Sequence, residues 1–268
     1  QRAVSAADSV MGVCLTYAAP AARAARMSSR EIGDPPIRNY RTRVRAVLIA
    51  NGGDNDGGVV AERFRELGWT FELWAREDAP SWPEFPTDVG LVLSLGSDWS
   101  VYWDDIATNV AAEDALLRAA HGRGVPIFGI CFGGQMLAHA LGGSVERSPE
   151  PEIGWFSVDF DEKLALFKQE VWFQWHYDRF TPPQDAEELG VGAQGSQAFL
   201  IGASLGLQFH PEVTSEIVGR WTTGGGAAEL SRVGVDAAQL VADTTAHAHM
   251  SRDAGRRLVD WFVAHVMN

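Results

Sequence analysis

Cys131 has the sequence environment of a reactive thiol, in the stretch Gly129-Ile130-Cys131-Phe132-Gly133. The apolar run 125–130 predicts a short buried strand, and the apolar residues of 132–141 recur at helical spacing. A strand, a glycine-flanked residue and a helix in this order form a nucleophile elbow, here with Cys at its tip. The first N–H groups of the helix point toward such a residue, where they favour a thiolate and stabilise an oxyanion. The elbow alone predicts a nucleophile and a buried structural cysteine about equally well.

The segment Gln208-Phe209-His210-Pro211-Glu212 supplies the groups that a thiol nucleophile needs. His210 can take the proton of the thiol and later donate it to a leaving amine. Because Pro211 holds the segment extended, His210 and Glu212 point the same way, and the carboxylate can orient the imidazole. Taken alone, the segment is better explained by a strand end followed by an acid in the first turn of a helix. Combined with Cys131, it favours a Cys-His-Glu triad.

Composition excludes several classes of protein. A net charge of −13 over 268 residues argues against a general nucleic-acid binder, and no run of 18 apolar residues predicts a membrane span. Two cysteines, Cys14 and Cys131, cannot form a disulfide framework, which favours a reduced, cytoplasmic setting. We expect no cofactor and no metal: His247 and His249 face apart on a helix, and the acidic turn 54–57 lacks the later glutamate of a calcium loop.

Residues 1–42 differ from the rest of the chain. They contain six Arg, three acidic residues and an Ala-rich stretch without sustained periodicity. Their apolar run, 10–19, is short and broken, unlike the core of a secretory signal. We therefore expect a flexible Arg- and Ala-rich extension, or a start assigned upstream of Met27, and a single domain over 43–268.

The surrounding elements predict how the two motifs meet. Apolar runs alternate with helical patterns, which is typical of an open, mostly parallel sheet covered by helices on both faces. The predicted strands are 44–50, 69–74, 89–95 and 125–130, and the predicted helices are 59–67, 109–121 and 132–141. Ligands bind beyond the carboxyl ends of such strands, where Cys131 and the loops 51–58 and 96–99 would gather. Strands at 155–160, 171–176, 198–202 and 205–210 predict an antiparallel second half. Helix follows from 213, with a break at 224–226 and a last segment at 256–267.

The two motifs, 129–135 and 208–212, resemble those of the class I glutamine amidotransferase domain in type, order and separation. The segments 96–102, 152–155 and 175–178 add to the resemblance, which covers roughly 44–266. It is closest to stand-alone bacterial proteins similar to the glutaminase domain of GMP synthase. The resemblance implies a flavodoxin-like fold.

The resemblance also implies a mechanism. Cys131 would attack the side-chain amide carbon of glutamine, and His210, oriented by Glu212, would protonate the departing ammonia. The N–H groups of Gly96 and Phe132 would form the oxyanion hole, in which one donor often contributes about 3–4 kcal/mol. Water would then release glutamate from a γ-glutamyl thioester.

The residues implied in substrate binding are Gln135 and the backbone around His176, Tyr177 and Asp178. The sequence departs from the family pattern in two places. Gly96 is followed by Ser97-Asp98-Trp99, where many members carry a second glycine and a proline, and Tyr177 stands where GMP synthase has glycine. Because a bulky Tyr177 would narrow or reshape the pocket, a γ-glutamyl compound other than glutamine stays open as the substrate.

Three functions follow from these observations. The first is a glutaminase that passes ammonia to a partner synthetase, since the sequence contains neither a P-loop nor an ATP-pyrophosphatase segment. The second is a self-sufficient hydrolase of γ-glutamyl amides or peptides with the same triad. The third is a catalytically silent binding protein, against which the intact Cys131, His210 and Glu212 count.

Overall fold

The centre of the fold is an eight-stranded sheet with the order β2-β1-β3-β4-β10-β9-β8-β6, in a computed structural model that describes residues 44–267. The strands from β2 to β10 are parallel, and β9, β8 and β6 extend the sheet in antiparallel fashion. The strands are β1 (Val44–Ala50), β2 (Trp69–Ala75), β3 (Val89–Ser94), β4 (Ile127–Ile130), β6 (Asp159–Phe160), β8 (Glu187–Gly192), β9 (Gly195–Ile201) and β10 (Ser204–Leu207). The predicted, mostly parallel sheet with antiparallel additions is confirmed. The predicted extension 1–42 lies outside the described residues.

The central strands are apolar on both faces, as parallel strands covered by helices are. In β1, Ala46, Leu48 and Ala50 belong to one apolar core, and Val47 and Ile49 belong to the other. Successive side chains of a strand point to opposite faces, so one short sequence contributes to both cores.

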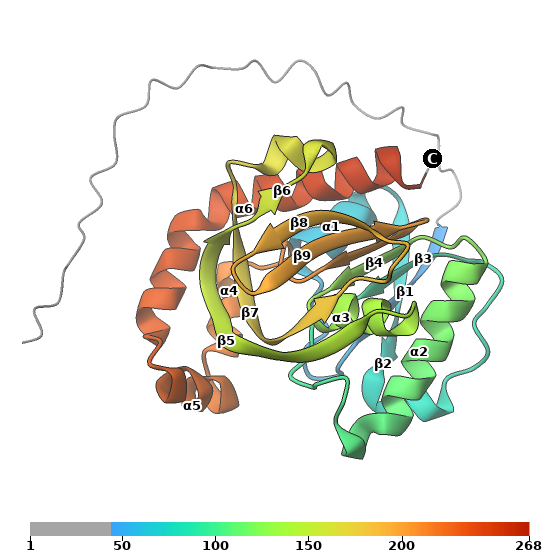
Figure 1. Cartoon of the computed structure of the whole chain (residues 1–268), viewed down its shortest axis with the longest axis horizontal. Helices are drawn as coiled ribbons and strands as arrows, with labels where there is room; N and C mark the ends of the chain where they lie inside the picture. Colours follow the sequence, from blue (N-terminus) through green and yellow to red (C-terminus); the bar gives the residue numbers. More distant parts are fainter. Residues whose placement is uncertain (1–43, 268) are drawn as a thin grey trace, which may run out of the picture. The chain divides into compact units, whose positions relative to one another are not determined.

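Helices cover both faces of the sheet (Figure 1). On one face α1 (Gly58–Glu66) packs against the C-terminal α6 (Ala237–His265), with the rings of Phe64 and Phe262 6.3 Å apart. On the other face lie α2 (Ala107–Gly122) and α3 (Phe132–Ala140), which share the second core. The doubly wound arrangement is therefore confirmed.

A second, two-stranded sheet crosses the elbow helix. It consists of β5 (Ser144–Ser157) and β7 (Val171–Thr181), which pair antiparallel and form a long curved ribbon over α3 (Figure 1). The predicted strand 155–160 was wrong as a single element: its first residues end β5, and 159–160 form β6 of the main sheet. Apolar and polar side chains continue to alternate through the junction, so the pattern does not reveal that the strand changes sheets.

The C-terminal helices differ from the prediction in their boundaries. The predicted break at 224–226 is the first turn of α5 (Gly224–Val233), and the predicted last segment is the second half of the 29-residue α6. Helix α6 begins where the Asp236 carboxylate accepts hydrogen bonds from the N–H groups of Ala238 (2.8 Å) and Gln239 (3.1 Å). Three short 3₁₀ segments, η1 (Arg76–Ser81), η2 (Asp104–Ile106) and η3 (Glu162–Phe167), complete the described elements together with α4 (Ser215–Trp221). None of the described helices combines the length and apolar character needed to cross a bilayer.

Glycines let α3 approach the ends of three strands. A Cβ on Gly133 would overlap the carbonyl of Ser94 in β3, and one on Gly134 would overlap the carbonyl of Leu207 in β10. A Cβ on Gly129 would lie 2.6 Å from the Gly133 carbonyl oxygen. Real Cβ atoms do not approach oxygen this closely, so any larger residue would push the helix away from the sheet.

We expect the Gly133→Ala substitution to lower the free energy of unfolding by about 2–3 kcal/mol, because the added methyl group has no room beside Ser94. Gly122→Ala, at the end of α2 where an added Cβ meets nothing within 4 Å, is the matched control. It should leave stability unchanged or raise it by up to about 1 kcal/mol. Urea unfolding of both variants measures the difference, and equal stabilities would contradict the packing argument.

Candidate active site

Cys131 sits at the carboxyl end of β4, on a backbone turn that is unusual for its residue type. Its φ of 51° and ψ of −108° make it the one non-glycine residue with positive φ among residues 44–267. The Cys131 N–H donates to the Leu207 carbonyl at 2.8 Å, and its own carbonyl accepts from the Gln135 N–H at 2.9 Å. This is the strained turn of a nucleophile elbow, held between β10 and the first turn of α3.

His210 and Glu212 follow β10, the strand next to β4. Leu207 is in register with Ile130, so the chain leaving β10 runs beside the elbow. His210 Nδ1 lies 2.8 Å from Glu212 Oε1, and both residues are only 3% exposed. Within the described chain His210 Nε2 is buried and makes no hydrogen bond of ordinary geometry. The predicted juxtaposition of Cys131, His210 and Glu212 is thus present in the structure.

The start of α1 holds Glu212 in place. The Glu212 carbonyl accepts a hydrogen bond from the Val59 N–H at 3.0 Å, and a Cβ on Gly58 would overlap this carbonyl. Gly58 has φ +45°, a conformation that favours glycine. The first residues of α1 therefore fix the backbone position of Glu212.

The environment of His210 favours the imidazolium form. Burial alone would lower the pKa of His210, but the Glu212 carboxylate, through its charge and its hydrogen bond to Nδ1, and the neighbouring Cys131 outweigh burial and raise the pKa well above 6.5. A protonated His210 beside Cys131 suits a general acid, because the imidazole already carries a proton that it could donate.

The two residues expected to form the oxyanion hole both lie next to Cys131. A Cβ built on Gly96 would be 3.1 Å from His210 Cε1 and 3.7 Å from Cys131 Cβ, so Gly96 lies against both. Phe132 is the first residue of α3, where backbone N–H groups have no acceptor within the helix. Their positions agree with an oxyanion hole at this end of β3 and β4.

The other expected site residues gather on the wall formed by β7 and α3. Gln135 Nε2 donates to the Asp178 carbonyl (3.2 Å), and His176 Nδ1 lies 2.9 Å from the same carbonyl oxygen. His176 Nε2 lies 3.1 Å from the Glu152 carboxylate. The Asp178 carboxylate accepts hydrogen bonds from the hydroxyl groups of Ser100 and Tyr102. The side chains of His176 and Asp178 and the Asp178 carbonyl are therefore all engaged within the protein.

A cavity of about 780 Å³ opens over Cys131. Its lining includes Cys131 and His210, which were expected to be catalytic, and Gly96, which was expected in the oxyanion hole. The residues expected to bind the substrate, Gln135 and 176–178, also line it. Trp175 and Trp221 form apolar walls, and the Trp221 ring lies 5.0 Å from the His210 ring. This volume falls in the range of pockets that hold drug-sized ligands.

The structure adds site residues that the sequence reasoning missed. Trp221 covers His210 and donates through Nε1 to the Asp54 carboxylate at 2.7 Å; burial raises the pKa of Asp54 above its ordinary value. Arg76 and Glu113 form a buried ion pair (Nε–Oε2 2.9 Å) beneath the Gly96 loop. In the sequence, the only indication that Arg76 belongs to the site was its position. It follows a predicted strand, at the sheet edge where ligands bind.

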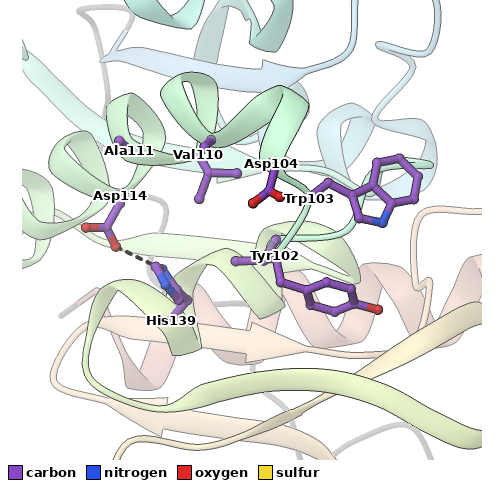
Figure 2. A pocket seen from close by; sticks show the side chains of 9 residues that line it. Tyr102, Trp103, Asp104, Val110, Ala111, Asp114 and His139 are labelled. Carbon is purple, nitrogen blue, oxygen red and sulfur yellow. Dashed lines mark ion pairs between the residues drawn. The ribbon is translucent and has the colours of Figure 1, made fainter.

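A smaller depression of about 340 Å³ lies beside the cavity, between α2 and α3 (Figure 2). The side chains of Asp114 of α2 and His139 of α3 contact each other in its lining (Oδ1–Nδ1 3.3 Å), together with Tyr102 and Trp103. It contains no thiol, so the chemistry of Cys131 belongs to the larger cavity. Within residues 44–267, no group of three or more His, Cys, Asp or Glu side chains is arranged to hold a metal ion.

Comparison with known proteins agrees with the fold and the geometry of this site. Residues 105–220 match the family model described as glutamine amidotransferase class-I, so the chain contains a class I glutamine amidotransferase domain. The GMP synthase (glutamine-hydrolyzing) of Vibrio cholerae serotype O1 is 33% identical over 178 residues, which cover 63% of this chain and 32% of that protein. The corresponding enzyme of Aeropyrum pernix is 33% identical over 211 residues, 73% of this chain and 39% of that protein.

Solved structures show the same relationship. A glutamine amidotransferase from Thermotoga maritima superposes with a TM-score of 0.73 at 28% identity, over 85% of this chain and 99% of that one. The chain spans about a third of the length of the curated GMP synthases that it matches. It is similar to their glutaminase part.

We expect the Glu212→Gln substitution to lower the pKa of His210, because the carboxylate charge that offsets the effect of burial is removed. In the wild type the raised pKa stabilises the fold below about pH 6.5, and this contribution is lost as the pH rises through the native pKa of His210. NMR titration of the imidazole and urea unfolding at pH 6 and pH 9 measure both effects. Glu216→Gln, an exposed acid of α4, is the control. An unchanged His210 titration in Glu212→Gln would contradict this account.

Proposed function

We propose that this protein hydrolyses the side-chain amide of glutamine through a Cys131-His210-Glu212 triad and delivers the ammonia to a partner synthetase. The observation that carries the proposal is the strained elbow at Cys131 beside a buried His210–Glu212 pair, under a cavity open to a ligand. The class I glutamine amidotransferase domain supports the choice of substrate.

The first half of the reaction uses the resting charges of the site. The Cys131 thiolate attacks the amide carbon of glutamine, and the carbonyl oxygen becomes an oxyanion between the N–H groups of Gly96 and Phe132. The His210 imidazolium, held by Glu212, donates its proton to the amide nitrogen. The C–N bond then breaks, ammonia leaves, and a γ-glutamyl thioester remains on Cys131.

The second half reverses these roles. Neutral His210 takes a proton from water, and the resulting hydroxide attacks the thioester carbon. The same two N–H groups stabilise the second oxyanion, and the Cys131 thiolate leaves as glutamate is formed. The sum is glutamine and water converted to glutamate and ammonia, with no cofactor.

Substrate binding is assigned to the wall of β7 and α3. Gln135 and the backbone of His176, Tyr177 and Asp178 would hold the amino acid end of glutamine, while the amide end points at Cys131. All four residues line the cavity over Cys131, which supports this assignment. A cytoplasmic location would keep the thiol reduced.

The choice of a synthetase as the partner is based on the proteins to which this chain is similar. The matched GMP synthases are named as glutamine-hydrolysing, and this chain spans about a third of their length. We propose that a synthetase subunit takes the ammonia that this chain releases.

A second function is favoured by the pocket itself. A cavity of about 780 Å³ exceeds what one amino acid requires, and Tyr177 lines it with its ring 4.5 Å from the Arg147 guanidinium. A γ-glutamyl amide or peptide with a larger leaving group would use this space and the same triad. The acyl-enzyme would be identical, so only the leaving group distinguishes the two functions.

A diazo-ketone analogue of glutamine tests the mechanism. We expect it to modify Cys131 in the wild type, with loss of activity, and to leave Cys131→Ser unmodified. Cys131→Ser should lose hydrolysis by at least about 10³-fold, because the hydroxyl is a far weaker nucleophile at neutral pH. Peptide mass spectrometry and ammonia release are the measurements. Full activity of Cys131→Ser would exclude the mechanism.

Tyr177→Gly separates the two substrates. Removing the ring enlarges the pocket, so we expect kcat/KM for γ-glutamyl peptides to change relative to glutamine, with Tyr177→Phe as the control that keeps the ring. If purified wild type turns over γ-glutamyl peptides faster than glutamine, with and without a candidate synthetase, the hydrolase function replaces the amidotransferase function.

A further inference from the structure

Arg76 is buried directly beneath the oxyanion loop, and neither the triad nor the substrate wall uses it. It follows β2 as the first residue of η1 and is 1% exposed. A buried guanidinium is costly unless its charge and its N–H groups are paired. Glu113 of α2, 2% exposed, supplies the charge: Arg76 Nε donates to Glu113 Oε2 at 2.9 Å.

Besides the Asn51 side chain (Nη1 to Oδ1, 3.2 Å), the Nη groups of Arg76 contact three consecutive residues at the end of β3. Nη2 donates to the Ser94 hydroxyl (3.0 Å) and the Leu95 carbonyl (2.7 Å), and Nη1 donates to the Gly96 carbonyl (2.9 Å). The Glu113 carboxylate also accepts from the Ser94 hydroxyl at 2.8 Å. Arg76 and Glu113 together therefore tie the last residue of the strand to the start of the loop.

These contacts determine where the Gly96 N–H points. The Leu95 carbonyl and the Gly96 N–H belong to one planar trans peptide, in which C=O and N–H point in opposite directions. Because Arg76 draws the Leu95 carbonyl toward itself, the Gly96 N–H is directed the other way. The Leu95 carbonyl also accepts from the Gly133 N–H at 3.1 Å, which joins the same peptide to the elbow helix.

Arg76 contacts the second oxyanion residue as well. Its guanidinium lies over the Phe132 ring, 4.8 Å from the ring centre. We propose that Arg76, held by Glu113, is a positioning residue that aims the N–H groups of Gly96 and Phe132 at the developing oxyanion. The inference rests on the proposed function, because it concerns the transition state of that reaction.

The test must separate positioning from stability. The double variant Arg76→Met/Glu113→Leu removes both charges and fills the space with apolar atoms, a change that buried ion pairs often tolerate without loss of stability. Arg76→Lys keeps the charge but not the fork of donors. Arg63→Met, which removes the ion pairs of Arg63 with Asp260 and Glu66 far from the cavity, is the control.

Two rates are compared in each variant: steady-state hydrolysis of glutamine and of a γ-glutamyl anilide, and alkylation of Cys131 by iodoacetamide, which forms no tetrahedral oxyanion. We expect the double variant to lose about 10- to 100-fold in kcat, with KM within about 3-fold and alkylation within about 2-fold of wild type. Arg76→Lys should fall between the double variant and wild type in kcat.

The inference is overturned if the double variant keeps the kcat of Arg63→Met, or if alkylation and hydrolysis fall together. Should the double variant not fold, Arg76→Lys decides: reduced kcat with normal alkylation supports the inference, and unchanged kcat overturns it. If wild type hydrolyses neither substrate, the proposed function fails and this inference fails with it.

Discussion

The left-handed backbone of Cys131 is the constraint on which the rest of the site depends. An L residue at φ 51° stores about 1–3 kcal/mol of strain, which the surroundings must offset. Here β10 accepts the Cys131 N–H, and α3 begins directly after the turn. Glycines at 129, 133 and 134 remove the Cβ atoms that would keep helix and strands apart. The thiol is thereby lifted out of the sheet, and the first amide of the helix is placed beside it.

Two buried charge pairs flank the site. In the proposed reaction His210, held by Glu212, would supply the proton for the leaving nitrogen, and Arg76 with Glu113 lies beneath the Gly96 loop that is proposed to bind the oxyanion. Each pair links elements that are distant in sequence, because ions in a dry interior are tolerated only when opposite charges and hydrogen-bond partners converge on them. The cost of burial is also what makes these groups rigid, since any displacement would leave a charge unpaired.

The wall of the cavity that carries residues 175–178 comes from outside the main sheet. The β5–β7 ribbon carries 175–178 over α3, and Asp178 connects it to the loop after β3 through Ser100 and Tyr102. Trp221 closes the other side by contacting both His210 and Asp54. Substrate groups would thus meet residues from four separate segments, while the reacting atoms stay on the strand ends of one sheet.

The two motifs around Cys131 and His210, and the run of strands and helices up to 141, could be derived from the residues because they depend on local periodicity and on turns that demand glycine. Those local rules sufficed for the parallel core of the sheet and for the pairing of thiol, imidazole and carboxylate. They failed where the outcome depends on contacts between distant segments. The alternation of apolar and polar residues through 155–160 is the same whether a strand continues or changes sheets. In the sequence, Arg76 and Glu113 cannot be distinguished from ordinary surface charges, because only the folded chain buries them against each other. Arg76 and Glu113 lie 37 residues apart in sequence. No local pattern encodes a contact that exists only when β2, β3 and α2 pack together.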